Sequence, residues 1–158
     1  MKHNFWVYEN ELAGRPGPGV APWQISDLKA GGINMILSVA SDLFPHTDAS
    51  RNGMSRTCIP FPDCAPPDDY TVRVCRASLP LTLEIIRSNI EESRTVLVHC
   101  AGGCDRTGLV LSYYIAWRER IGPVEAIAKL RTTRPDALKA NGWEQMAIRL
   151  FPELRKDS

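Results

Sequence analysis

The sequence predicts a single α/β domain with a central, mainly parallel sheet of roughly four or five strands and helices on both faces. Three observations carry this prediction. Apolar segments of strand type alternate with segments of helical periodicity in the middle of the chain, and the C-terminal third is mostly helical. Thr95–Val98 is short, β-branched and continuously apolar, which is typical of a parallel strand buried on both faces. The 158 residues have the length of one domain, and no linker divides them.

The N-terminal segments are expected to form an edge of the sheet and its first helix. Phe5–Tyr8 is aromatic and β-branched, which favours an edge strand. Ala13–Gly19 is so rich in glycine and proline that we expect a turn without regular structure. A short helix is predicted over Pro22–Ala30, because proline suits its first turn and Gly31–Gly32 would end it.

The next segments alternate between predicted strands and loops. Ile33–Val39 is mostly apolar and predicts a buried strand, and the polar residues 41–55 predict a surface loop. Thr57–Phe61 predicts a short strand. Phe61–Asp69 is too rich in proline to be a helix or a central strand.

The C-terminal half is expected to be helical on both sides of its buried strand. Leu79–Ser93 carries apolar residues at helical spacing, and Thr107–Arg120 is apolar enough for a largely buried helix. Further helices are predicted over Pro123–Thr133 and from about Leu138 to Phe151.

Composition and charge narrow the function classes. A formal charge of +1 gives no support to nucleic-acid binding, so we expect no nucleic-acid partner. No apolar run approaches the roughly 18 residues that span a bilayer, so no membrane association is expected. Five cysteines are an odd count in a chain larger than most disulfide-stapled domains. Since the N-terminus also lacks an apolar signal segment, we expect free thiols and a cytoplasmic location.

The stretch HCAGGCDRTG at residues 99–108 predicts an oxyanion site. It follows a predicted buried strand and precedes a predicted helix, and the N-terminus of a helix favours anions. Gly102 and Gly103 permit a tight loop whose backbone amides converge on one ligand. Arg106 adds a planar, permanently charged fork that matches phosphate oxygens.

The same surroundings favour a thiolate at Cys100, because helix N-termini and arginines stabilise a negatively charged sulfur. A thiolate beneath a bound phosphoryl group is placed to attack phosphorus, and a hydroxyl donated by Thr107 would stabilise it. A buried inert thiol is the alternative. A zinc site is disfavoured, because His99, Cys100 and Cys104 lack a second ligand pair and Arg106 would oppose a cation.

Residues 99–108 resemble the H-C-x-x-G-x-x-R-[ST]-G signature of the cysteine-dependent protein tyrosine and dual-specificity phosphatases. The segments NFWVYENELAG, LKAGGINMILSV, IPFPDCAPP and RTTRPDAL…WEQ are also similar to the small, atypical dual-specificity phosphatases. The resemblance implies that residues 1–158 form one phosphatase catalytic domain.

The resemblance also implies roles for the signature residues. Cys100 would be the nucleophile and Arg106 the phosphate clamp, with His99 supporting the loop. The substrate's phosphate would lie in a cradle formed by Ala101, Gly102, Gly103, Cys104, Asp105 and Arg106. Neither a metal ion nor an organic cofactor is expected to be needed.

The cleavage also needs a general acid to protonate the leaving oxygen. The segment IPFPDCAPP resembles the family's acid loop and puts Asp63 in the acid position. Asp63 lies farther from Cys100 than in the closest relatives, and the extra residues appear as an insertion, DDYTVRVCRA, before the next helix. Asp68 or Asp69 therefore stays open as the acid, although both also suit turn-capping roles.

The expected function is hydrolysis of phosphate monoesters, on phosphoproteins or small phosphate esters, through a phosphocysteine intermediate. Two alternatives are kept: a phosphate-binding module with little turnover, and a sulfurtransferase of the rhodanese type. The signature loop lacks lysines, with Ala101 and Cys104 at the corresponding positions, so a phosphoinositide preference is not indicated. The choice between phosphotyrosine and phosphoserine or phosphothreonine is left open.

Overall fold

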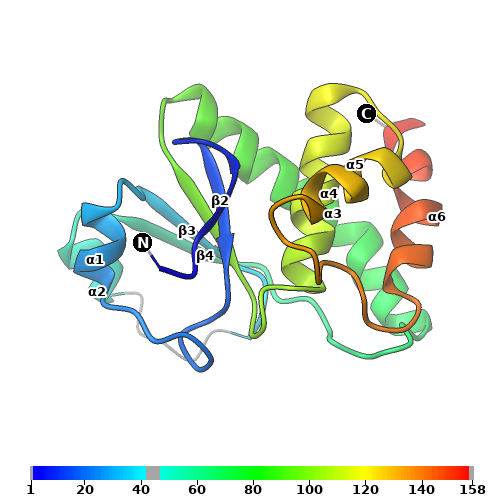
Figure 1. The fold of residues 1–158 in the computed structure, drawn as a ribbon, viewed down its shortest axis with the longest axis horizontal. Coiled ribbons are helices and arrows are strands. Elements are labelled where there is room, and N and C mark those ends of the chain that lie inside the picture. The colour runs from blue at the N-terminus through cyan, green and yellow to red at the C-terminus, as the bar shows by residue number, and fades with distance from the viewer. Residues whose placement is uncertain (1, 42–46, 157–158) are drawn as a thin grey trace.

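A computed structural model describes residues 2–41 and 47–156 and contains a five-stranded sheet (Figure 1). The strands are β1 (Phe5–Tyr8), β2 (Leu12–Arg15), β3 (Met35–Ser38), β4 (Ser55–Cys58) and β5 (Val96–His99). They lie in the order β1-β2-β5-β3-β4, and only β1 runs antiparallel to its neighbour. The predicted α/β fold with a mainly parallel sheet is therefore confirmed, as are the edge strand at Phe5–Tyr8 and the central buried strand.

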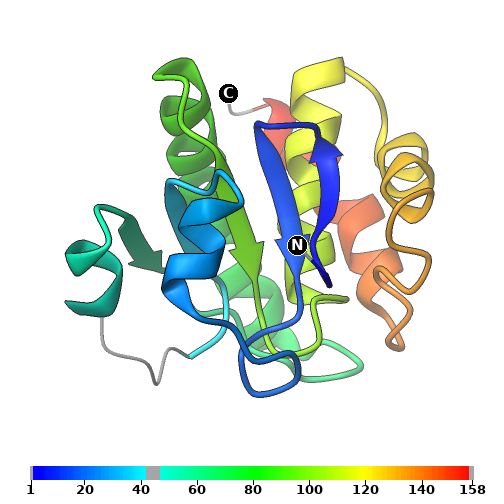
Figure 2. The same cartoon turned by 60° about the vertical axis from the view of Figure 1, so that its left-hand side comes forward.

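Helices cover both faces of the sheet (Figures 1 and 2). One face carries α1 (Ile25–Ala30) and α2 (Thr47–Arg51), and the other carries α3 (Asp69–Glu91), α4 (Arg106–Glu119), α5 (Pro123–Arg131) and α6 (Trp143–Lys156). Within the described ranges, no helix is both long enough and apolar enough to cross a membrane.

Successive side chains of the strands point to opposite faces of the sheet and pack into two separate hydrophobic cores. In β5, Val96 and Val98 pack with α3, α4 and α6, whereas Leu97 packs on the α1 side with Leu28 and Ile36. This alternation is the two-residue period of a β-strand. Because β2 and β3 flank β5 in parallel, the loop after β5 emerges at the carboxyl edge of the sheet, where parallel α/β folds bind ligands.

The turn expected over Ala13–Gly19 is wrong in its first part, because Leu12–Arg15 forms the buried strand β2. Tertiary packing explains the error. A Cβ atom on Gly14 would lie 2.4 Å from the Phe5 ring and 2.9 Å from Leu111 Cδ1. Glycine therefore lets the β1 edge and α4 approach the strand closely, which local propensity does not reveal.

The surface loop expected over residues 41–55 is also wrong in part. Residues 42–46 lie outside the described part of the chain, but α2 follows them and buries Ala49 against α1 and β3. Met54 is buried as well, and β4 begins earlier than the strand expected at Thr57–Phe61. A single turn of helix carries too few apolar residues to show periodicity.

The segment DDYTVRVCRA is the start of α3 and not an insertion before it. Asp68 caps the helix, since its carboxylate accepts hydrogen bonds from Thr71 N at 2.8 Å and from Thr71 Oγ1 at 2.7 Å. Cys75 and Leu79 continue the buried stripe, so the helix passes Pro80 without ending. The last helix starts at Trp143, later than expected, because Leu138 and Gly142 have positive φ angles of 58° and 83° that a right-handed helix does not allow.

Replacing Gly14 with alanine should lower the free energy of unfolding by about 1–3 kcal/mol, because the added methyl group collides with Phe5 and Leu111. Urea unfolding measures the loss. Gly19→Ala is the matched control, since nothing lies within 4 Å of the added atom there. Equal stabilities for the two variants would contradict this packing.

Burial raises the pKa of the Cys75 thiol to about 12. Iodoacetamide at pH 8.5 should therefore modify the exposed Cys64 in the folded protein and leave Cys75 unmodified until urea unfolds the chain. Peptide mass spectrometry reads the result. Because the folded pKa is raised, ionisation of the unfolded thiol should also reduce stability as the pH rises above about 8.5. Rapid modification of native Cys75 would be inconsistent with its burial.

Candidate functional site

The signature residues form a tight loop between β5 and α4. Cys100 lies at its start, is 4% exposed, and its Sγ accepts a hydrogen bond from Gly103 N at 3.3 Å. Arg106 is the first residue of α4, whose N-terminus contributes partial positive charge at this place. The loop thus turns the backbone amide of Gly103 toward the sulfur.

Gly103 and Gly17 allow the loop to lie directly against the end of β2. Gly103 has φ of 73°, and a Cβ atom on it would lie 2.8 Å from the backbone of Arg15. A Cβ atom on Gly17 would lie 2.2 Å from Cys100 O, and Gly17 N donates to Ala101 O at 2.7 Å. The back of the loop therefore has no room for side chains at these two positions.

Arg134 holds the outside of the loop and was not predicted to do so. Its Nη2 donates to Gly102 O at 2.6 Å, and its Nε donates to Gly103 O at 3.2 Å. In a trans peptide the N–H points away from the C=O, so carbonyls drawn outward direct the next amides inward. An isolated arginine before a proline carries no local signal for this contact.

Asp105 and Cys104 tie the other end of the loop to the segment before α6. Asp105 Oδ1 accepts a hydrogen bond from Ala140 N at 3.2 Å, and Cys104 O accepts one from Leu138 N at 3.3 Å. Asp105, directly before Arg106, therefore has a structural contact within this chain.

A partly buried indole and a buried guanidinium support His99. The His99 Nδ1 atom lies 3.1 Å from Cys100 O, and the Trp23 ring packs edge-on against the imidazole with centroids 4.9 Å apart. Arg15, 1% exposed, places its guanidinium 4.9 Å from the Trp23 ring centroid and donates to Ala21 O at 2.7 Å. Burial lowers the pKa of Arg15 without removing its charge at neutral pH. Arg15 was not predicted as a site residue, because it lies in the segment expected to form a turn.

The hydrogen bond expected from Thr107 to the Cys100 sulfur is absent. Thr107 is fully buried, and its hydroxyl has no hydrogen-bond partner among the described residues. The sulfur accepts its hydrogen bond from Gly103 N instead.

One cavity of about 210 Å³ brings the acid candidate Asp63 to the loop. It is lined by Asp63, Cys100, Gly102, Cys104, Asp105 and Arg106. Ala101 and Gly103 belong to the same loop but are not among the lining residues. Trp143 Nε1 donates to Cys64 O at 3.0 Å and so fixes the segment next to Asp63.

The other two acid candidates belong to α3. Hydrogen bonds from Thr71 lower the pKa of Asp68, which keeps this capping carboxylate ionised. Asp69 lies in the first turn of the helix. Of the three aspartates, only Asp63 lines the cavity with Cys100.

Gly103→Ala should lower the free energy of unfolding by about 2 kcal/mol or more and abolish binding of inorganic phosphate, because the methyl group meets the Arg15 backbone at a positive φ. Urea unfolding and a phosphate titration measure the two effects. Gly102→Ala should keep its stability, since its added atom meets nothing within 4 Å. The same stability loss in both variants would argue against the close contact.

Comparison with known proteins gives a consistent result. Residues 22–148 match the family model for the dual specificity phosphatase catalytic domain. The protein tyrosine phosphatase PRL-1 of Leishmania major is 24% identical over 131 residues, which cover 78% of this chain and 71% of that protein.

Solved structures share the fold at lower identity. Tk-PTP in its active form superposes with a TM-score of 0.80 at 19% identity and covers 100% of this chain and 99% of its own. Human DUSP28 gives 0.74 at 16% identity, with coverage of 99% and 97%. PTPMT1 in complex with PI(5)P gives 0.78 at 10% identity, with 99% of both chains covered. The family match extends over most of the chain, and the signature loop has the geometry described above, so this chain belongs to the dual specificity phosphatases.

Proposed function

We propose that this chain removes phosphate from phosphorylated proteins, with Cys100 as nucleophile, Arg106 as phosphate clamp and Asp63 as general acid and base. The observation that carries the proposal is that these three side chains line one cavity. Residues 1–158 would act as one catalytic domain.

In the first step the Cys100 thiolate attacks phosphorus, and an S–P bond forms as the ester P–O bond breaks. Asp63 gives its proton to the leaving oxygen, which departs as an alcohol or phenol. The loop amides and Arg106 bind the three equatorial oxygens, on which the transition-state charge is spread. Gly103 N, which donates to the sulfur at 3.3 Å, supports the thiolate.

In the second step the ionised Asp63 takes a proton from water, and the water oxygen attacks phosphorus. The S–P bond breaks, inorganic phosphate leaves, and the Cys100 thiolate is restored. This scheme uses no metal ion and no organic cofactor. In this scheme the buried Thr107 hydroxyl, which has no hydrogen-bond partner among the described residues, would donate to the departing Cys100 sulfur.

Phosphoproteins and small aryl phosphates are the proposed substrates. PTPMT1 is solved with a phosphoinositide, but Ala101 and Cys104 provide no cation in this chain's loop for additional ring phosphates. A phosphomonoester on a peptide fits the small cavity of about 210 Å³. The five cysteines are free thiols, which supports a reducing compartment such as the cytoplasm as the place of action.

Cys100→Ser should abolish hydrolysis of phosphotyrosine and phosphoserine peptides in the presence of EDTA. Asp63→Asn should lower kcat about 100-fold or more on phosphoserine, whose alkoxide leaves poorly without a proton. Asp68→Asn is the matched control and should keep its activity, because asparagine caps a helix as well as aspartate does. Phosphate release measures all three. Full activity of Asp63→Asn on phosphoserine would exclude this aspartate as the acid.

Assays on the wild-type protein distinguish a phosphatase from a sulfurtransferase and from a phosphate-binding module. A sulfurtransferase would form thiocyanate from thiosulfate and cyanide, and a binding module would retain phosphopeptides without releasing phosphate. Wild-type protein that releases no phosphate under reducing conditions would overturn the proposed reaction.

A further inference from the structure

A pocket of about 280 Å³ lies where the loop that carries Asp63 meets the first turns of α3 and α6. Two prolines of that loop form one wall, and residues of the two helices form the others. Its lining residues, which differ from those of the catalytic cavity, are Pro66, Pro67, Val72, Gly142, Gln145, Met146 and Arg149. We call this space the α3–α6 pocket.

Arg149 gives the α3–α6 pocket a cation without a carboxylate partner. One helical turn beyond the pocket, where α3 and α6 lie side by side (Figure 1), Arg76 and Glu153 form an ion pair at 3.3 Å. Glu153 is therefore already paired. Arg149 itself is exposed and forms no ion pair or hydrogen bond with any residue that the structure describes.

The carboxylates in the first turns of the two helices do not neutralise this cation. Glu144 accepts two hydrogen bonds of 3.2 Å from the Arg131 guanidinium of α5. Asp68 caps α3, and Asp69 is exposed in the first turn of that helix without forming an ion pair with Arg149. An anion that enters the pocket therefore meets an unpaired guanidinium.

The other lining groups favour an anion that is carried on an apolar stem. Pro66, Pro67 and Val72 offer apolar surface. Gln145 is exposed and lies one helical turn before Arg149, so its amide adds a second donor on the same face of α6. Guanidinium and amide groups both donate to carboxylate oxygens. A glutamate side chain combines such a carboxylate with two methylene groups that fit against the apolar walls.

The loop that carries Asp63 joins the catalytic cavity to the α3–α6 pocket. Asp63 lines the cavity, and Pro66, three residues later, lines the pocket. Three residues of extended chain span at most about 11 Å. Trp143 Nε1 donates to Cys64 O at 3.0 Å and so ties this loop to the helix that carries Arg149. A peptide with its phosphorylated residue in the cavity therefore reaches the pocket with a residue three or four positions away.

We propose that the α3–α6 pocket is a substrate subsite that binds a glutamate three or four residues from the phosphorylated residue of a protein substrate. Arg149 is its specificity-determining residue, and Gln145 assists it. The inference rests on the proposed phosphatase function, because it describes the sequence around the phosphorylated residue. Since Arg149 does not line the catalytic cavity, it acts on peptide affinity and not on the chemical step.

Peptide binding to the Cys100→Ser variant tests the subsite without turnover. One phosphotyrosine peptide carries glutamate at the third and fourth positions on both sides of the phosphotyrosine, and a second peptide carries glutamine at the same positions. Fluorescence anisotropy should show about fivefold tighter binding of the glutamate peptide. The additional substitution Arg149→Ala should remove this preference.

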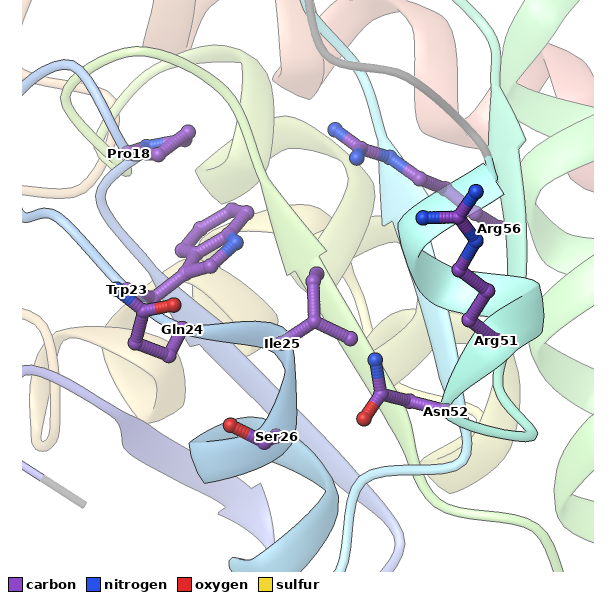
Figure 3. Close-up of a pocket in the computed structure, with 8 residues that line it drawn as sticks. All are labelled: Pro18, Trp23, Gln24, Ile25, Ser26, Arg51, Asn52 and Arg56. Atoms are coloured by element: carbon purple, nitrogen blue, oxygen red, sulfur yellow. The ribbon is translucent and has the colours of Figure 1, made fainter.

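Arg51→Ala, made in the same Cys100→Ser background, is the matched control. It removes the same charge from an exposed arginine of α2, which lines a different cleft on the other face of the sheet (Figure 3). This variant should keep the fivefold preference. Equal preferences in the Arg149→Ala and Arg51→Ala variants, or no preference in Cys100→Ser alone, would overturn the proposal.

Hydrolysis of p-nitrophenyl phosphate, which has no peptide to reach the pocket, reports separately on the proposed reaction. With Cys100 in place, the Arg149→Ala variant should hydrolyse it at the wild-type rate. Absence of hydrolysis by the wild type would overturn the reaction, whereas the peptide comparison alone decides the subsite.

Discussion

The signature loop depends on hydrogen bonds that hold four successive carbonyl groups on its outer side. Gly17 N donates to Ala101 O, Arg134 donates to the oxygens of Gly102 and Gly103, and Leu138 N donates to Cys104 O. Because N–H and C=O point in opposite directions in a trans peptide, these bonds turn the following amides to the inner side. The shape of the anion cradle therefore depends on residues outside the loop that need not touch the substrate.

This arrangement explains why elements that are distant in the chain meet at one edge of the sheet. β2 brings Arg15 and Gly17 against the back of the loop, and the segment after α5 brings Arg134 and Leu138 against its side. Parallel pairing of β2, β3 and β5 places their carboxyl ends together, so the loops that follow them converge. The sheet thus fixes where the loops meet, and the loops carry the residues that form the site.

Behind His99, the Trp23 indole packs edge-on against the imidazole, and the buried Arg15 guanidinium lies 4.9 Å from the centroid of the same indole ring. The hydrogen bonds of Arg15 go to neutral oxygens of Pro16, Ala21 and Asn4 among the described residues. Arg15 therefore adds a cation that keeps its charge to the group of residues that supports His99.

Local patterns in the sequence determined the buried strand at Thr95–Val98, the loop and helix after it and the family signature, since each depends on neighbouring residues. The same patterns predicted a turn where β2 lies. Glycine is required at Gly14 because Phe5 and Leu111, which are distant in the chain, pack against it. The patterns left the acid open between Asp63 and the pair at the start of α3. Only the tertiary structure places Asp63 in the cavity. It also shows that Asp68 caps α3 and that Arg134 donates hydrogen bonds to the loop carbonyls. Contacts between residues far apart in the chain leave no periodicity or spacing in the sequence, and these contacts decide the shape of the site.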